Sequence, residues 1–228
     1  MSDIVISIDL RPHFGPARNQ GHRPTCLAFA ASDAHAGLRN GWAPLSCEYA
    51  FYHAQRRAGL PPGAGALVSS MLDALREEGQ PEERGWPYLA ATPIDIASWV
   101  PPAKVGPRFG RNGRTSSISL DQIIRELDQG RPLIILLTLS RAFYGPNAQA
   151  VVDPAIGETP EPQRRHAVIA VGHGYVDGQR AILSRNSWGL KWGDGGHAWL
   201  TERFLGPRLY AAAKLMEDVD VSARFAAA

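Results

Sequence analysis

A cysteine, a histidine and an asparagine follow one another in an order that suits covalent catalysis by a thiol. Cys26 lies in the segment NQGHRPTCLAFA, His166 follows 140 residues later in RRHAVIAVG, and Asn186 comes a further 20 residues on in SRNSWGLKWGDGG. An imidazole can pair with a thiolate nucleophile and then give a proton to a leaving amine. Gln20, six residues before Cys26, could donate its side-chain amide to an oxyanion.

The setting of Cys26 favours a reactive thiol. An Ala-rich segment with apolar residues at helical spacing follows it directly, so Cys26 is expected at a helix N-terminus. The N–H groups and the dipole at such an end stabilise a thiolate relative to a thiol. Taken alone, a cysteine is more often a small buried hydrophobic residue. Catalysis is the favoured interpretation because Gln20, His166 and Asn186 accompany it.

These segments resemble the papain family of cysteine peptidases from about Ile8 to Leu205. Gln-Gly-x3-Thr-Cys-x-Ala-Phe is similar to the family's nucleophile segment, HAVIAVGHG to its histidine strand, and RNSWGLKWGDGG to its Asn-Ser-Trp-Gly segment. IDLRPHFGPARNQ resembles the mature N-terminus of the family. The resemblance implies an α+β, two-lobe fold, with a helical N-terminal lobe, an antiparallel β-barrel-like C-terminal lobe and an active-site cleft between them.

The resemblance also implies roles for individual residues. Cys26 would be the nucleophile, His166 its acid–base partner, and Asn186 the acceptor that orients the ring. Gln20 and the backbone N–H of Cys26 would form the oxyanion hole. The residues expected to bind substrate are Gly65, Ala66, Leu67, Val68, Ala167 and Trp188, the last of which would also cover the histidine–asparagine hydrogen bond.

Several positions depart from the family pattern. Arg23-Pro24-Thr25 replaces the usual Cys-Gly-Ser, so the disulfide that this cysteine normally forms is absent. Leu27 replaces the usual tryptophan, and Ala66 replaces a glycine that lines the cleft. Arg165 precedes the histidine where Asn or Asp is usual. Cys47 is expected to be a structural thiol outside any disulfide.

The remaining pattern predicts helices first and strands later, which is typical of a segregated α+β domain. Residues 93–117 lack periodicity and are rich in Pro, Gly and Arg, so they are expected to form the connection between the two lobes. Arg108, Arg111 and Arg114 are expected to lie in this solvated linker. We expect one domain over 1–228, with a helical lobe at about 12–115 and a β lobe at about 116–215 plus the N-terminal strand. The predicted helices are 27–38, 47–57, 67–78 and 120–129, and the predicted strands are 4–10, 132–139, 166–176, 180–185 and 197–200.

The composition and charge of the chain limit the classes of partner that it is expected to bind. The net charge of +2 favours neither nucleic acid nor a membrane, and the longest apolar run, 132–139, is too short to span a bilayer. No cysteine–histidine cluster has metal-ligand spacing, so neither a metal nor a cofactor is expected. The start of the chain shows no basic and apolar signal pattern, so a cytoplasmic location is expected, with a secreted effector as the alternative. The expected partner is a protein or peptide substrate, with control by a larger parent protein or a separate inhibitor.

The leading hypothesis is a cysteine endopeptidase that works through a thioester acyl-enzyme. The same thiol site could instead carry out other acyl transfer, such as transpeptidation, deamidation or removal of a modifier protein, because a fold does not fix a substrate. A catalytically dead interaction module is disfavoured, because all four expected catalytic residues are present.

Overall fold

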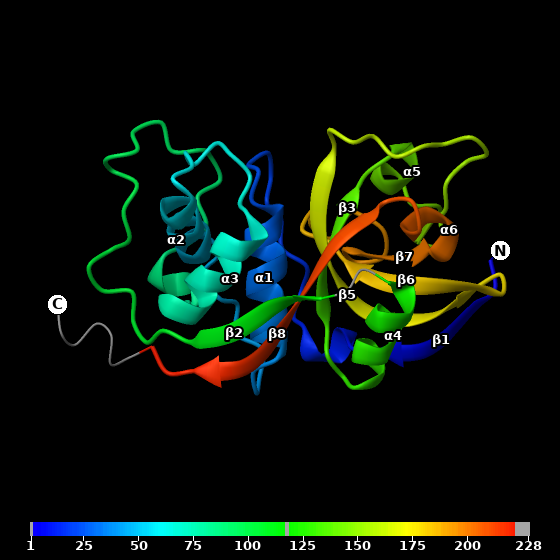
Figure 1. Ribbon diagram of the computed structural model, residues 1–228, viewed down its shortest axis with the longest axis horizontal. Helices are drawn as coiled ribbons and strands as arrows, with labels where there is room; N and C mark the ends of the chain where they lie inside the picture. The colour runs from blue at the N-terminus through cyan, green and yellow to red at the C-terminus, as the bar shows by residue number, and fades with distance from the viewer. Residues whose placement is uncertain (1, 117–118, 222–228) are drawn as a thin grey trace. The chain divides into compact units, whose positions relative to one another are not determined.

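The computed structural model describes residues 2–116 and 119–221, and the chain divides into two compact units (Figure 1). One unit comprises Met1–Asn19 with Thr115–Lys214, and the other comprises Gln20–Arg114 with Leu215–Ala228. Each unit is therefore built from two stretches of chain that are distant in sequence. The expected α+β class is confirmed, because the unit that contains Gln20–Arg114 carries helices and the other carries most of the strands.

Local sequence signals set the ends of the helices in the Gln20–Arg114 unit. The Ser46 hydroxyl accepts from the Tyr49 N–H at 3.0 Å at the start of one helix, and Gly59 ends it with a φ of 65°. The Ala-rich helix is buried along nearly its whole length, because its small side chains allow close packing. All three predicted helices of this unit are confirmed, as α1 (Cys26–Gly37), α2 (Cys47–Ala58) and α3 (Val68–Glu77).

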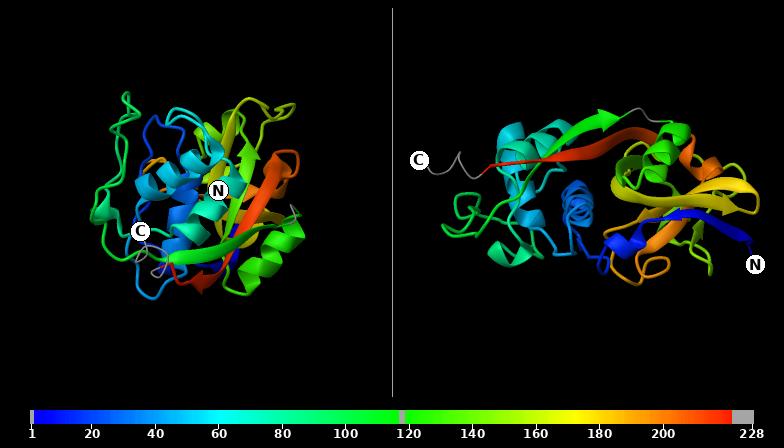
Figure 2. Two further views of the ribbon diagram at one scale, coloured as in Figure 1. Left: turned by 60° about the vertical axis from the view of Figure 1, so that its left-hand side comes forward. Right: turned by 90° about the horizontal axis from the view of Figure 1, so that it is seen from below.

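The Thr115–Lys214 unit contains a mostly antiparallel sheet in the order β8-β3-β5-β6-β7-β4, with β1 paired to β5. Figure 2 shows β1, in dark blue, running alongside the sheet. Helix α4 (Leu120–Asp128), capped by Ser119, packs against β5 as its amphipathic pattern predicts. The strands are β1 (Ile4–Asp9), β3 (Leu133–Thr138), β4 (Val151–Val152), β5 (Arg165–Val176), β6 (Gln179–Arg185), β7 (His197–Thr201) and β8 (Leu209–Val219).

Four short elements complete the described chain. Two are single turns of α-helix in the sheet-bearing unit, and two are 3-10 turns. They are α5 (Arg141–Tyr144), α6 (Glu202–Leu205), η1 (Arg11–His13) and η2 (Glu83–Gly85). Among the described residues, no helix combines the length and apolar character needed to cross a bilayer.

The prediction of a solvated, irregular linker over 93–117 is wrong at its C-terminal end. Residues Gly110–Ser116 form strand β2, which pairs with β8, while residue 117 lies outside the described part of the chain. Arg111 is only 5% exposed, and its guanidinium donates to the Met216 carbonyl at 2.6 Å and to Asp218. The sequence GRNGRTS has no apolar alternation, so pairing with a distant strand, rather than local pattern, makes it a strand.

Candidate active site

The predicted histidine–asparagine pair lies within the sheet-bearing unit. His166 is the second residue of β5, and Asn186 directly follows β6, the antiparallel neighbour of β5. The His166 Nε2 and Asn186 Oδ1 atoms are 2.7 Å apart, and the two residues are 5% and 2% exposed. Asn186 Oδ1 also accepts from the Ser187 N–H at 2.8 Å, which fixes the orientation of the amide. When Nε2 donates to this oxygen, Nδ1 is the ring atom that can exchange a proton.

Aromatic side chains enclose this pair. The Trp188 ring lies 4.7 Å from the His166 ring, centroid to centroid, and the Phe143 ring lies 5.6 Å from it. Tyr144 stacks on Trp188 with the planes 18° apart, and the Trp192 indole donates to the Phe143 carbonyl at 2.9 Å. Sequence reasoning anticipated Trp188 but missed Phe143 and Tyr144. They lie on the four-residue helix α5, which is too short to give a periodic signal.

Burial controls the charge of this imidazole. Loss of solvent lowers the pKa of His166 from 6.5 to about 4, and the hydrogen bond to Asn186 acts in the opposite direction. A cation in this apolar surrounding needs a nearby anion to balance it. The ring is therefore neutral near pH 7 unless a negative group is brought to it.

The predicted nucleophile lies in the helical unit. Cys26 is the first residue of α1 and is partly exposed, whereas the next ten residues, 27–36, are buried. Thr25, the residue before it, does not cap the helix with its side chain, and its hydroxyl instead bonds the Tyr88 hydroxyl at 2.9 Å. Cys26 thus presents its thiol at the positive end of a twelve-residue helix.

Gln20 is held in the loop that leads to this helix. Its side chain is 6% exposed, and its Nε2 donates to the Arg23 carbonyl at 2.9 Å. The Tyr88 hydroxyl donates to the Gln20 carbonyl at 2.7 Å. Gln20 and Cys26, which sequence reasoning placed in one oxyanion hole, therefore lie at the two ends of one bonded loop.

The residues expected to bind substrate fall into two groups. In the helical unit, Gly65 and Ala66 precede α3, Leu67 is its N-cap residue with 52% of its surface exposed, and Val68 is its first residue. In the other unit, Ala167 is 2% exposed within β5, next to His166. The four-residue run before and into α3 is thus accessible, whereas Ala167 offers little surface of its own.

The second cysteine, Cys47, does not belong to the candidate active site. Cys47 is buried at the start of α2, and neither it nor Cys26 forms a disulfide. Across residues 2–116 and 119–221, no group of three or more His, Cys, Asp or Glu side chains is placed to hold a metal ion.

Comparisons with known proteins point to one family. The sequence model for papain family cysteine proteases matches residues 63–205, more than half of the chain, a stretch that contains His166 and Asn186 and begins after Cys26. The chain is 27% identical over 192 residues to thiol protease aleurain of Arabidopsis thaliana, covering 80% of this chain and 51% of that protein. It is 25% identical over 201 residues to pro-cathepsin H of Mus musculus, covering 82% and 56% respectively. The chain thus spans about half the length of the curated relatives that it matches.

Solved structures show the same fold. Xylellain, a cysteine protease from Xylella fastidiosa, superposes with a TM-score of 0.74 at 22% identity, covering 93% of this chain and 86% of that one. Digestive procathepsin L 3 of the Tenebrio molitor larval midgut gives a TM-score of 0.71 at 17% identity, covering 94% and 71%. The predicted papain-like fold is confirmed, and the chain belongs to the papain family of cysteine proteases.

Proposed function

We propose that the protein is a cysteine endopeptidase that hydrolyses peptide bonds with Cys26, His166, Asn186 and Gln20. The observation that carries this proposal is the buried 2.7 Å contact between His166 and Asn186, which leaves one ring nitrogen for proton transfer. The position of Cys26 at the start of α1 and membership of the papain family support it.

In the first half of the reaction, the Cys26 thiolate attacks the carbonyl carbon of the peptide bond, and the electron pair of the C=O bond moves onto oxygen. The Cys26 N–H and the Gln20 amide donate to this oxyanion. The carbon–nitrogen bond then breaks as the His166 imidazolium gives its Nδ1 proton to the leaving amine. The products are a thioester on Cys26 and a free amine.

In the second half, the neutral His166 ring removes a proton from water, and the resulting hydroxide equivalent attacks the thioester carbonyl. The carbon–sulfur bond breaks, the carboxylic acid product leaves, and the thiolate–imidazolium pair is restored. Asn186 keeps the ring in the tautomer and orientation that both halves require.

Hydrolysis of a fluorogenic dipeptide substrate tests this proposal, with Cys26→Ala as the variant and Cys47→Ala as the matched thiol control. We expect wild type and Cys47→Ala to release the fluorophore, and Cys26→Ala to lose turnover by several orders of magnitude. A competing amine added to the assay separates hydrolysis from acyl transfer, since capture of the acyl group as an amide would favour transfer. A folded wild-type protein that releases nothing would contradict the proposal.

A further inference from the structure

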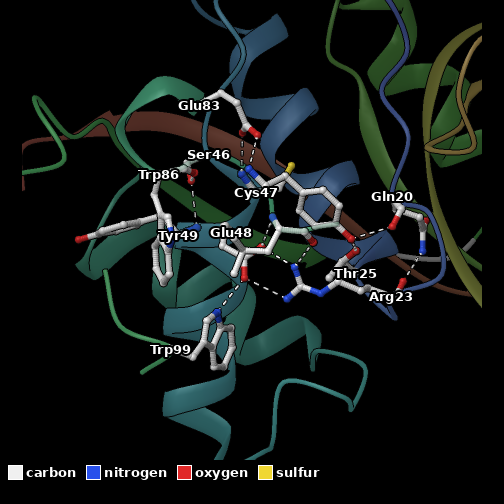
Figure 3. A network of polar contacts seen from close by, with 12 residues as sticks. Gln20, Arg23, Thr25, Ser46, Cys47, Glu48, Tyr49, Glu83, Trp86 and Trp99 are labelled. Atoms are coloured by element: carbon white, nitrogen blue, oxygen red, sulfur yellow. Dashed lines mark hydrogen bonds and ion pairs between the residues drawn. The ribbon is translucent and has the colours of Figure 1, made fainter. Parts of the chain in front are cut away.

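The loop between Gln20 and Cys26 contains a buried charge. Arg23 is 2% exposed, and its guanidinium donates from Nη1 to Glu48 Oε2 at 2.5 Å and from Nη2 to Glu48 Oε1 at 2.9 Å. Glu48, on α2, has no exposed side-chain surface. Figure 3 shows this two-point contact at the centre of a polar network. Sequence reasoning noted Arg23 only as a departure from the family pattern and did not predict its partner.

The Glu48 carboxylate ties this contact to a third segment. It accepts from the Trp99 indole at 2.7 Å and from the Leu89 N–H at 3.1 Å, in addition to both Arg23 bonds. The Leu89 carbonyl in turn accepts from Arg23 Nη1 at 2.7 Å. The middle of the Gln20–Cys26 loop is thereby fixed to α2 and to the segment that carries Leu89 and Trp99.

Tyr88 fixes the two ends of the same loop. Its hydroxyl donates to the Gln20 carbonyl at 2.7 Å and lies 2.9 Å from the Thr25 hydroxyl, next to Cys26. Its ring lies under the Arg23 guanidinium at 5.0 Å and meets the Phe29 ring edge-on at 4.7 Å. Burial raises the pKa of Tyr88 above 10.0, so the hydroxyl keeps the proton that it donates.

Arg23 also contacts Gln20, the expected oxyanion donor. The Arg23 carbonyl accepts from the Gln20 side-chain amide at 2.9 Å, so the position of the Arg23 main chain helps to set where that amide lies. A buried ion pair contributes little net stability compared with well-packed apolar residues of similar volume. The clearest consequence of this ion pair is that it fixes the position of the groups bonded to it. Misplacing a catalytic group by about 1 Å can lower the reaction rate about 100-fold.

We propose that Arg23, held by Glu48, and Tyr88 are positioning residues that set where the Gln20 amide lies relative to the Cys26 thiol. This inference rests on the proposed peptidase function. Neither residue is assigned a contact with substrate, so they act through Gln20 and the start of α1. The Arg23–Glu48 ion pair does not depend on redox state. Reducing conditions that keep Cys26 as a thiol therefore leave the Gln20–Cys26 loop held in place.

Removal of a single hydroxyl gives the first test. Tyr88→Phe keeps the ring against Arg23 and Phe29 but removes both bonds at the loop ends, and Tyr175→Phe, on exposed β5 surface, is the control. We expect kcat to fall by about 10- to 100-fold with little change in KM. Alkylation of Cys26 by iodoacetamide, which forms no oxyanion, should change by less than about threefold, because the helix end that stabilises the thiolate is intact.

The outcomes separate the two proposals. A wild-type protein without hydrolysis would contradict the peptidase function, whereas an active wild type with unchanged kcat in Tyr88→Phe would overturn the positioning role. Equal losses of hydrolysis and alkylation would also overturn it, since the thiol itself would then be damaged. Amide hydrogen exchange over residues 20–26 gives a readout that needs no activity. Faster exchange there in Tyr88→Phe is expected, and unchanged exchange would refute the inference.

A double variant tests the ion pair without leaving a buried charge. Arg23→Met with Glu48→Met replaces both partners by apolar groups, so the fold should be kept, with a lowered thermal midpoint because the Trp99 indole and the Leu89 N–H lose their acceptor. We expect its kcat to fall at least 10-fold, and Arg23→Lys, which keeps one charged donor, to fall less. A folded double variant with wild-type kcat would show that the ion pair does not position Gln20.

Discussion

The 2.7 Å contact between His166 Nε2 and Asn186 Oδ1 fixes which ring nitrogen is left for chemistry. The Asn186 oxygen also holds the Ser187 N–H, so the amide cannot turn without losing two bonds. We expect Asn186→Ala to lower kcat by roughly 10- to 100-fold, because the ring loses its fixed orientation. Steady-state kinetics check this, with Asn112→Ala as the control, since the Asn112 side chain on β2 makes a solvent-exposed hydrogen bond to Glu217. A variant with wild-type kcat would remove Asn186 from the mechanism.

The charge of His166 should depend on the thiolate. Burial lowers the pKa of His166 and the Asn186 hydrogen bond raises it, which together give about 4, so in Cys26→Ala, where no thiolate can balance the ring, we expect titration near that value. In wild type the paired thiolate should raise the apparent pKa well above 4. NMR titration of the ring in both proteins measures this difference. Titration near 6.5 in Cys26→Ala would show that the ring is not desolvated as described.

Mild acid should destabilise the fold through its buried histidines. Burial is the largest cause of a lowered pKa at three histidines outside the proposed thiolate pair, so between about pH 6.5 and pH 4 the unfolded chain binds protons that the folded chain does not. The free energy of unfolding therefore decreases as the pH is lowered from 6.5 to 4. The decrease is up to about 1.4 kcal/mol per pH unit for each histidine. The three are His35, His53 and His197.

A variant can isolate one of these contributions. His35 has a pKa near 3 and is fully buried, so His35→Leu should flatten the pH dependence of stability between pH 6.5 and pH 4. His22→Gln, at an exposed loop position, is the control. Urea unfolding at three or four pH values gives the slope. A His35→Leu slope equal to that of wild type would contradict the assignment.

Substrate preference should be apolar at the second residue before the scissile bond. Leu67 is half exposed at the start of α3, and neither it nor Val68 can pair with a charge. Burying an aliphatic or aromatic side chain against them would contribute roughly 1.5–3 kcal/mol. A positional-scanning peptide library measures the preference, and Leu67→Lys should shift it toward Asp or Glu. A wild-type preference for acidic residues would instead implicate the exposed Arg165.

The helices and strands that could be predicted from the sequence have capping residues or apolar runs within or next to their own segments. Ser46 and Gly59 bound α2, and Ser119 and Gly130 bound α4, because capping and left-handed turns are local properties. Strand β3 follows from its unbroken apolar run. These short-range rules place the elements that carry the predicted triad.

The parts that could not be predicted depend on distant partners. Strand β8 has two adjacent buried residues, Ala212 and Ala213, so it lacks simple alternation. The Arg23–Glu48 pair joins residues on a loop and a helix, and nothing in either segment specifies the other. Phe143 reaches His166 from a single helical turn for the same reason. In each case tertiary packing decides the structure.

Labelling with a thiol-directed peptidyl epoxide, followed by intact mass and peptide mapping, shows which of the two thiols is activated. We expect one adduct, on Cys26, formed much more slowly in His166→Ala, with the buried Cys47 unmodified. An unlabelled Cys26 in folded protein, or equal labelling of Cys26 and Cys47, would contradict the assignment of Cys26 as the activated nucleophile.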